Sequence, residues 1–214
     1  MKIIAHRGSS KIFKENTLDA FRESVNSGVK ILELDVCICR NKHLVVSHEN
    51  VDKKTGVPIS DTVQNTHLKL ETFLKAFSCL DVEFIFDVKE FTSSVLIIQL
   101  LMEKLNCYGV CHKSIIASFN ESHLEFLRDY RLPGLKIALI SERIECDFFK
   151  KLVEKTEIDF LIVPVSHTTR ELVEKCSVPV LAYTCNTIGM FEYCRNIGTQ
   201  GVFSDCPEDF VQIT

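Results

Sequence analysis

The sequence has 214 residues, 46% of them hydrophobic, which is enough for one large domain or two small ones with a sizeable buried core. Its 25 Lys and Arg against 29 Asp and Glu give a net charge of −4, which excludes the basic field that binds nucleic acid without sequence preference. Ten cysteines would suggest a disulfide framework in a secreted chain, but no apolar segment resembles the core of a signal peptide. No apolar segment reaches the ~20 residues needed to cross a bilayer either. We therefore expect a soluble, cytoplasmic protein with reduced thiols.

Short apolar runs rich in β-branched residues alternate along the chain with longer segments of helical period. The predicted strands, in chain order, are Lys2–Ala5, Ile31–Val36, Phe84–Val88, Ser114–Ser118, Lys136–Ile140, Phe160–Val163, Val180–Tyr183 and Gly201–Ser204. The predicted helices are Leu18–Ser27, Leu70–Phe77, Ser94–Leu105, Glu121–Asp129, Cys146–Lys155, Thr169–Lys175 and Ile188–Asn196. Asn16 or Thr17, followed by Asp19, indicates a capped start for the first helix.

About eight strands in βα alternation favour a (β/α)₈ TIM barrel, with an open doubly wound sheet as the alternative. No repeat or linker divides the chain, so we expect one domain over residues 1–214. A typical barrel has ~250 residues, so this one is compact, with short loops and little or no final helix. Leu44–Ser47 follows the second strand too soon for the alternation, and we expect an extension strand or hairpin there.

The unusual polar residues fall at the ends of the predicted strands. His6 and Arg7 follow the first strand, Glu33 and Asp35 lie within the second, His48 follows Leu44–Ser47, and Asp87 and Lys89 close the third. In a barrel, side chains at the C-terminal ends of the strands converge on one mouth, so residues far apart in sequence share a site. We therefore expect a functional site at this mouth.

Glu33 and Asp35 are two residues apart on one strand, so their side chains share a face, which in an apolar strand is the barrel interior. Two ionised carboxylates repel and desolvate each other there unless a cation is bound. With Asp87 from the next strand, these hard oxygen ligands favour Mg²⁺ or Ca²⁺. In the alternative, one carboxylate faces a helix and pairs with Lys30 or Lys89.

Two histidines and two cationic side chains complete the pattern. His6 and His48 each precede a loop, and imidazoles that titrate near neutral pH suit a general acid and a general base. Arg7 and Lys89 add positive charge, and the planar Arg fork suits a phosphate. A simpler alternative for Arg7 is an ion pair with Glu15. Together, a divalent metal, two histidines and an anion-binding Arg describe a metal-assisted phosphodiester cleavage site.

Four short motifs carry a resemblance to a known family. They are Ala-His-Arg-Gly at 5–8, Glu-Asn-Thr-Leu-Asp-Ala-Phe at 15–21, Glu-Leu-Asp-Val at 33–36 and Val-Val-Ser-His at 45–48. In this order and spacing they resemble the glycerophosphodiester phosphodiesterase family, whose members are (β/α)₈ barrels. The likeness continues more weakly to Gly-Val-Phe-Ser-Asp-Cys-Pro at 201–207.

The resemblance implies a metal-dependent hydrolysis of glycerophosphodiesters to glycerol 3-phosphate and an alcohol. It implies His6 and His48 as the acid–base pair, Arg7 and Lys89 beside the phosphate, Glu33, Asp35 and Asp87 as the metal ligands, and Glu15 and Asn16 as supporting residues. Which histidine is the acid, whether the metal is Mg²⁺ or Ca²⁺, and whether the chain forms a homodimer stay open.

Three departures from the family pattern bear on substrate choice. Asp87 is one methylene shorter than the usual Glu, and in this it resembles related sphingomyelinase D and phospholipase D toxins. Tyr183 stands where the family commonly has Trp. The stretch from His48 to Leu70 is short, so we expect that the insertion which many members carry after the second strand is reduced.

Two alternative functions therefore stand beside the first. One is a phospholipase D-type enzyme acting on lysophospholipid or sphingomyelin, which Asp87 indicates. The other is a barrel that binds a phosphodiester or a partner protein without catalysis, and the retained acid–base set of His6 and His48 argues against it. In the favoured reading the partner is a small-molecule glycerophosphodiester, with no nucleic acid and no transmembrane segment.

The remaining cysteines and histidines carry weaker signals. Cys37 and Cys39 share a strand face and, with His43, suggest a zinc site, but the chain has no Cys-x₂-Cys knuckle, so we expect buried, reduced thiols. Four further histidines have no partner pattern and are predicted at the surface: His67, His112, His123 and His167.

Overall fold

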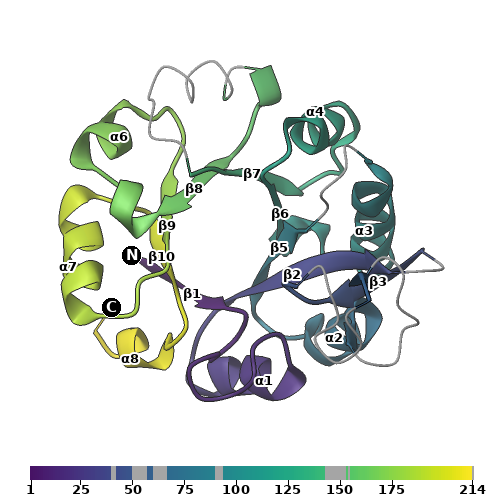
Figure 1. Ribbon diagram of the computed structural model, residues 1–214, viewed down its shortest axis with the longest axis horizontal. Helices are drawn as coiled ribbons and strands as arrows, with labels where there is room; N and C mark the ends of the chain where they lie inside the picture. The colour runs from purple at the N-terminus through teal and green to yellow at the C-terminus, as the bar shows by residue number, and fades with distance from the viewer. Residues whose placement is uncertain are drawn as a thin grey trace.

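A computed structural model describes residues 1–39, 42–49, 57–59, 67–89, 94–142, 153 and 155–213. Its sheet has ten strands, of which β3 and β4 are antiparallel and the other eight form a parallel ring (Figure 1). The ring strands are β1 (Lys2–His6), β2 (Ile31–Cys39), β5 (Glu83–Val88), β6 (Ser114–Ser118), β7 (Lys136–Ile140), β8 (Phe160–Pro164), β9 (Val180–Tyr183) and β10 (Gly201–Ser204). Because β1 pairs with both β10 and β2, the sheet closes, and the predicted TIM barrel is confirmed.

Helices surround this ring (Figure 1). They are α1 (Leu18–Asn26), α2 (Leu70–Phe77), α3 (Leu96–Cys107), α4 (Glu121–Tyr130), α6 (Arg170–Lys175), α7 (Ile188–Ile197) and α8 (Glu208–Val211), with 3₁₀ turns at Cys111–Lys113 and Val165–His167. The hydroxyl of Thr17 accepts a hydrogen bond from the backbone of Ala20 (3.4 Å), so the predicted cap of α1 is confirmed. The predicted helix Cys146–Lys155 lies mostly outside the described residues.

A hairpin extends β2 beyond the ring. Strand β3 (His43–Val46) runs antiparallel to the end of β2, with Val46 opposite Val36, and β4 (Leu68–Lys69) pairs with β3. The predicted extension strand is therefore confirmed, whereas the two-residue β4 was not predicted. The expected reduction of the insertion after β2 concerns residues 50–66, most of which lie outside the described ranges.

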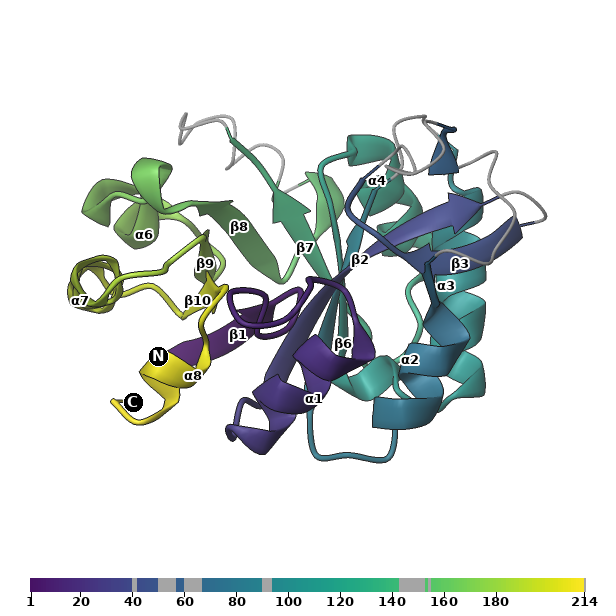
Figure 2. The same cartoon turned by 60° about the horizontal axis from the view of Figure 1, so that its bottom comes forward.

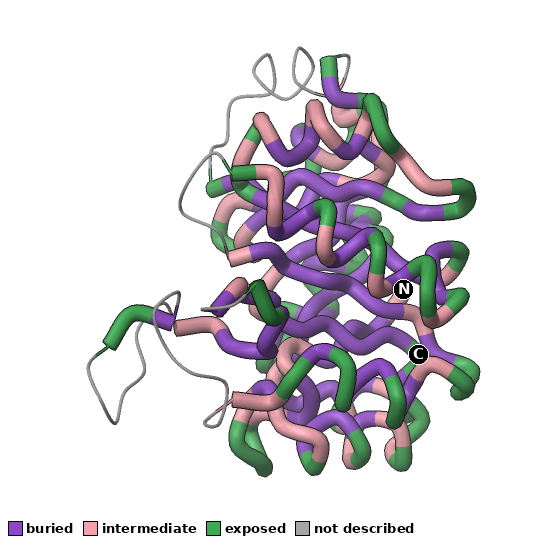
Figure 3. Tube along the Cα trace, turned by 90° about the vertical axis from the view of Figure 1, so that its right-hand side faces the viewer, coloured by how far each residue is buried: buried purple, intermediate pink, exposed green. Residues whose placement is uncertain are grey.

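Two apolar layers hold the barrel together. The ring strands are buried almost throughout, and the surrounding helices bury one side each (Figure 3). Between the sheet and the helices, Phe21 on α1, Phe73 on α2 and Phe84 on β5 contact one another edge to face, with ring centroids 4.9 and 5.5 Å apart along this series. Strands buried on both faces explain why the sequence shows continuous apolar runs instead of an alternating pattern.

The chain begins and ends on the same side of the barrel, where β1 and α8 lie near each other (Figure 2). The loop after β1 is tied to the end of β10 by a backbone hydrogen bond from Lys11 to Asp205 (2.9 Å). This seam joins the first and last strands of the ring. Among the described residues, no helix combines the length and apolar character that a membrane span requires.

Candidate active site

The interior of the barrel changes from apolar to polar toward the C-terminal ends of its strands. A cluster of interior residues from all eight strands fills the barrel: Ile4, Ile31, Ile85, Ile115, Ala117, Ala138, Ile140, Ile162, Leu181 and Phe203. We call this apolar cluster the floor of the barrel. Side chains two residues apart on a strand share a face, so the next interior positions lie just above this floor. In β8 this position is Pro164, and in the other seven strands the residues are His6, Glu33, Asp87, Phe119, Glu142, Tyr183 and Asp205.

Above this floor lies a cavity of about 210 Å³. Its lining includes six of the predicted site residues: His6, Arg7, Glu33, His48, Asp87 and Lys89. The cavity therefore opens at the C-terminal mouth, where barrel enzymes carry their active sites. Most of the remaining lining comes from the opposite side, from β6 to β10, where Glu142, Tyr183 and Thr184 are the polar members.

The predicted carboxylates meet on neighbouring strands. Asp35 of β2 stands opposite Asp87 of β5 in the sheet register, and one oxygen of each, with one of Glu33, lie within 4.8 Å of one another. All three side chains are buried. Burial, reinforced by the charge of Asp35, raises the pKa of Glu33 to about 8. Burial also raises the pKa of Asp87, to about 6, although the nearby Lys89 opposes it.

Two cations lie against these carboxylates. Lys89 Nζ lies 2.5 Å from Asp87 Oδ2 and 3.2 Å from Asp35 Oδ1. Arg7 Nε lies 3.0 Å from Asp35 Oδ2, and its Nη1 donates to Glu15 Oε2 (2.9 Å). Burial tends to raise the pKa of Asp35, but the charges of Lys89 and Arg7 outweigh burial and hold it below its usual range. Arg7 thus forms the ion pair with Glu15 that was the simpler alternative predicted from the sequence, and it also pairs with Asp35.

The motif around Asn16 secures the same carboxylate. Asn16 is buried, donates through Nδ2 to Asp35 Oδ2 (2.7 Å) and accepts from the Asp35 backbone through Oδ1 (3.3 Å). The backbone of Arg7 donates to Glu33 Oε2 (2.9 Å). Glu15 and Asn16, predicted as supporting residues, therefore contact Arg7 and Asp35 directly.

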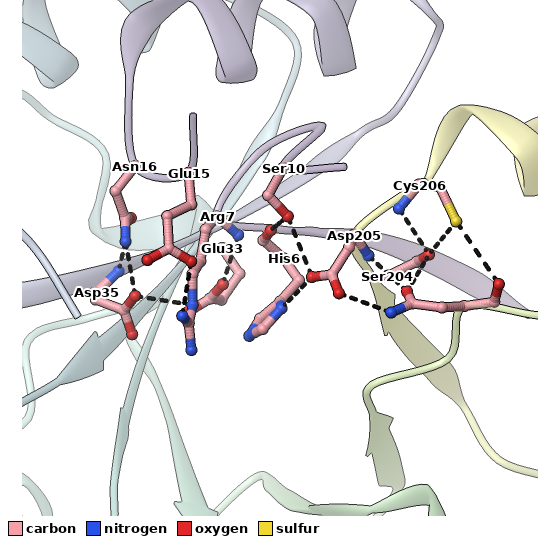
Figure 4. Close-up of polar contacts among 11 residues, drawn as sticks. His6, Arg7, Ser10, Glu15, Asn16, Glu33, Asp35, Ser204, Asp205 and Cys206 are labelled. Carbon is pink, nitrogen blue, oxygen red and sulfur yellow. Dashed lines mark hydrogen bonds and ion pairs between the residues drawn. The ribbon is translucent and has the colours of Figure 1, made fainter. Parts of the chain in front are cut away.

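His6 is held by Asp205, for which no role was predicted from the sequence. Its Nδ1 donates to Asp205 Oδ1 (2.6 Å), and the ring directs its other nitrogen away from Asp205 (Figure 4). Asp205 also accepts from Ser10 Oγ (3.1 Å) and Asn186 Nδ2 (2.6 Å). Burial would raise the pKa of Asp205, but these hydrogen bonds outweigh it and lower the pKa to about 2. The carboxylate therefore stays ionised and fixes the orientation of the imidazole.

The pKa values of the two imidazoles shift in opposite directions. Burial lowers the pKa of His6, but the bond to Asp205 and the charge of Glu33 outweigh burial, and the net shift is upward. Burial lowers the pKa of His48, and the charge of Asp35 does not compensate, so the net shift is downward. Such divergence is what an acid and a base in one site require.

The chemistry of the acidic cluster fits a hard divalent cation. Three carboxyl groups converge here, and a bound cation would favour the ionised form of Glu33, whose pKa burial and the charge of Asp35 otherwise raise. The Oδ1 atom of Asp87 is buried and finds no hydrogen-bond partner among the described residues. Oxygen ligands of this kind are those that Mg²⁺ and Ca²⁺ prefer. Glu33, Asp35 and Asp87 therefore form a suitable ligand set.

The same register shows which signal would have found the residues that were missed. Asp205 and Glu142 each lie two positions beyond the last apolar interior residue of their strands, as His6, Glu33 and the already noted Tyr183 do. Period-two counting along every strand would have placed all of them at the mouth.

Three other expectations concern residues elsewhere in the barrel. His123 is wholly buried and not a surface residue, because its ring bonds the Ser118 hydroxyl (3.0 Å) and the Ser94 carbonyl (3.1 Å). The Cys37 thiol donates to the carbonyl of Ser47 (3.0 Å), a structural contact in the wall of the hairpin. Lys30, the other proposed partner for a site carboxylate, pairs with Asp81 at the surface instead.

Sequence comparisons point to one family. The profile of the glycerophosphoryl diester phosphodiesterase family matches residues 6–209. A glycerophosphodiester phosphodiesterase of Caldanaerobacter subterraneus is 28% identical over 99% of this chain and 96% of its own. A human lysophospholipase D is 43% identical, but only over 28% of this chain and 19% of its own length.

Solved structures share the fold. An Oleispira antarctica phosphodiesterase, determined in complex with the product sn-glycerol 3-phosphate, superposes with a TM-score of 0.90. The alignment covers 99% of this chain and 96% of that one, at 21% identity. At 21% identity this likeness establishes the fold alone. The chemistry has to be argued from the residues at the mouth of the barrel.

Proposed function

The chain belongs to the glycerophosphoryl diester phosphodiesterase family and is a phosphoric diester hydrolase, and from that premise we propose that it converts glycerophosphodiesters to sn-glycerol 3-phosphate and an alcohol by metal-dependent catalysis with two histidines. One observation carries this proposal: a single cavity is lined by His6, Arg7, Glu33, His48, Asp87 and Lys89, and Asp35 completes the carboxylate cluster beside it. The product complex of the Oleispira antarctica relative supports the choice of substrate class.

Substrate binding follows from the charges at the mouth. Arg7 presents a planar guanidinium, which suits two phosphate oxygens at once, and Lys89 adds a second positive charge. A divalent cation held by Glu33, Asp35 and Asp87 would supply positive charge that stabilises the phosphate in the transition state. Asn16 and the backbone of Arg7 keep these carboxylates in place.

The imidazoles move the protons. An oxygen of water, or of the neighbouring glycerol hydroxyl, forms a bond to phosphorus while the bond from phosphorus to the alcohol oxygen breaks. One imidazole takes the proton of the attacking oxygen, and the other gives a proton to the departing alkoxide. If the glycerol hydroxyl attacks, a cyclic phosphate forms and water then opens it. Asp205 keeps His6 Nδ1 engaged, so the nitrogen available for proton transfer is Nε2.

Single alanine variants test the acid–base pair. His6→Ala and His48→Ala should each lower kcat on glycerophosphocholine by about 10²–10⁴-fold, because general acid–base catalysis contributes that much. Circular dichroism should show an unchanged fold. Activity near that of the unaltered protein in either variant would remove that histidine from the mechanism.

A lysophospholipase D activity is the second candidate. Apolar side chains are exposed in the loops that follow β1 and β6, with Ile12 61% and Phe119 48% exposed. Such side chains suit a substrate with an acyl chain, and the human relative that matches part of the chain bears that activity in its name. Choline release from lysophosphatidylcholine, compared with sn-glycerol 3-phosphate release from glycerophosphocholine, separates the two candidates.

A further inference from the structure

The cavity has two unlike sides. The side formed by β1, β2, β5 and the loop after β3 carries the two histidines, the cations and the carboxylates described above. The opposite side, from β6 to β9, is largely apolar, with Ile140 and Ile162 among its lining residues and Glu142, Tyr183 and Thr184 as its polar members. A phosphodiester carries two alcohols on one phosphate. With the glycerol phosphate on the charged side, as the proposed function requires, the second alcohol must lie over the apolar side.

A buried phenol marks this apolar side. The Tyr183 ring packs on the barrel floor, and its hydroxyl is buried at the cavity wall. Nothing in the part of the chain that the structure describes bonds to this oxygen. Burial, together with the nearby carboxylates of Glu142 and Asp87, raises the pKa of Tyr183 to about 12, so the phenol keeps its proton and can donate it. A buried hydroxyl without a partner is costly, and a substrate oxygen would supply that partner.

A carboxylate and a second aromatic ring complete the wall. Glu142 follows β7, lines the cavity and is close enough to Tyr183 to act on its pKa. Phe119 follows β6, also lines the cavity and is 48% exposed. The face of this ring already attracts a cation, because Lys89 Nζ lies 5.7 Å from its centroid. Aromatic faces beside a carboxylate attract an ammonium group and disfavour an anion.

We propose that this wall, formed by Phe119, Ile140, Glu142 and Tyr183, binds the departing alcohol and selects alcohols that carry an ammonium group. The inference rests on the proposed function and adds the substrate class. The apolar floor accommodates the methyl or methylene groups of such an alcohol, Glu142 balances its charge, and the Tyr183 hydroxyl donates to an oxygen of the ester.

The test compares three esters that differ in the charge of the alcohol. Glycerophosphocholine and glycerophosphoethanolamine carry an ammonium group, and glycerophosphoglycerol carries none. We expect kcat/KM to favour the two ammonium esters by about 5- to 10-fold, the range of one cation–π or ion-pair contact. Glu142→Gln should remove most of this preference by slowing the ammonium esters alone. Glu103→Gln, an exposed residue on α3 at the outer surface, serves as the matched control and should leave all rates unchanged.

Tyr183→Phe separates the phenol from the carboxylate. It should lower kcat/KM for all three esters by roughly tenfold, because the ester oxygen is common to them. Equal rates on the three esters, or an equal effect of Glu142→Gln on each, would overturn the selection while leaving the proposed function intact. Failure of the unaltered protein to hydrolyse any of the three would instead overturn the proposed function, and the inference with it.

Discussion

At the scale of single residues, one contact organises the proposed chemistry. Asp205 and His6 are 199 positions apart in the sequence, yet their side chains meet at 2.6 Å across the seam between β10 and β1. The motif at 5–8 and its place after a strand identify His6 in the sequence. The role of Asp205 depends on the closure of the ring, which no local pattern specifies, and so it could not be predicted.

Asp205→Asn tests this positioning contact. The amide keeps the shape of the carboxylate but no longer favours the Nδ1–H form of His6, so kcat should fall by roughly 10²-fold with little change in KM. Ser10→Ala removes a weaker hydrogen bond to the same carboxylate and should have a much smaller effect. A change in KM alone would place Asp205 in substrate binding instead of imidazole orientation.

The same carboxylate predicts how stability depends on pH. The pKa of Asp205 is about 2 in the folded chain, against an ordinary value of ~3.9 when unfolded. The unfolded state therefore binds the proton more readily, and the contribution of Asp205 to stability is complete above about pH 4 and is lost as the pH falls toward 2.

Urea unfolding followed between pH 5 and pH 2 measures this contribution. The free energy of unfolding of the unaltered protein should fall more steeply below pH 4 than that of Asp205→Asn. If the free energies of unfolding of the two proteins fell in parallel with pH, the hydrogen bonds from His6, Asn186 and Ser10 would not lower the pKa of Asp205 in the folded state.

At the scale of elements, the turn from β1 into α1 positions two side chains of the site from uncommon backbone conformations. Arg7 (φ 60°), Gly8 (φ 84°) and Asn16 (φ 59°) all adopt left-handed conformations. Arg7 and Asn16 reach Asp35 from these positions. Strained backbone of this kind persists where the surrounding contacts fix it, often at functional sites.

Gly8→Ala should disrupt this turn. Besides its positive φ, a Cβ at position 8 would lie 2.6 Å from the backbone carbon of Ala20, so strain and overpacking together should lower the free energy of unfolding by about 2–4 kcal/mol. Gly189→Ala is the matched control, because nothing lies within 4 Å of its Cβ and it is in α7. That substitution should raise stability by up to about 1 kcal/mol. Similar urea midpoints for the two variants would contradict the assigned role of Gly8.

The elements themselves follow closely from sequence pattern. Strands β6, β7, β9 and β10 begin and end as predicted, because apolar runs flanked by turn residues define a strand buried on both faces. Strand β4 was missed because two residues, Leu68–Lys69, leave no periodicity to detect. The burial of His123 was missed for a different reason, since its partners Ser94 and Ser118 come together only in the folded barrel.

At the scale of the whole molecule, the barrel brings residues that are far apart in the sequence together at one mouth. The carboxylates come from β2 and β5, the histidines from β1 and the loop after β3, and the proposed alcohol wall from strands on the opposite side. The sequence motifs identified the charged side because its residues cluster in short segments near the start of the chain. The opposite side lies on separate strands, where the likeness to the family is weaker, and only the closed ring shows that it faces the same cavity.

The most direct test of this account is the release of sn-glycerol 3-phosphate from glycerophosphocholine with the metal removed and restored. We predict no release in EDTA, recovery when Mg²⁺ or Ca²⁺ is added, and no recovery in Glu33→Gln, whose amide is a poor ligand for a hard cation. Glu83→Gln, which changes a carboxylate at the far end of β5, should behave as the unaltered protein does. Release that persists in EDTA, or that Glu33→Gln retains, would contradict a metal-dependent site on Glu33, Asp35 and Asp87.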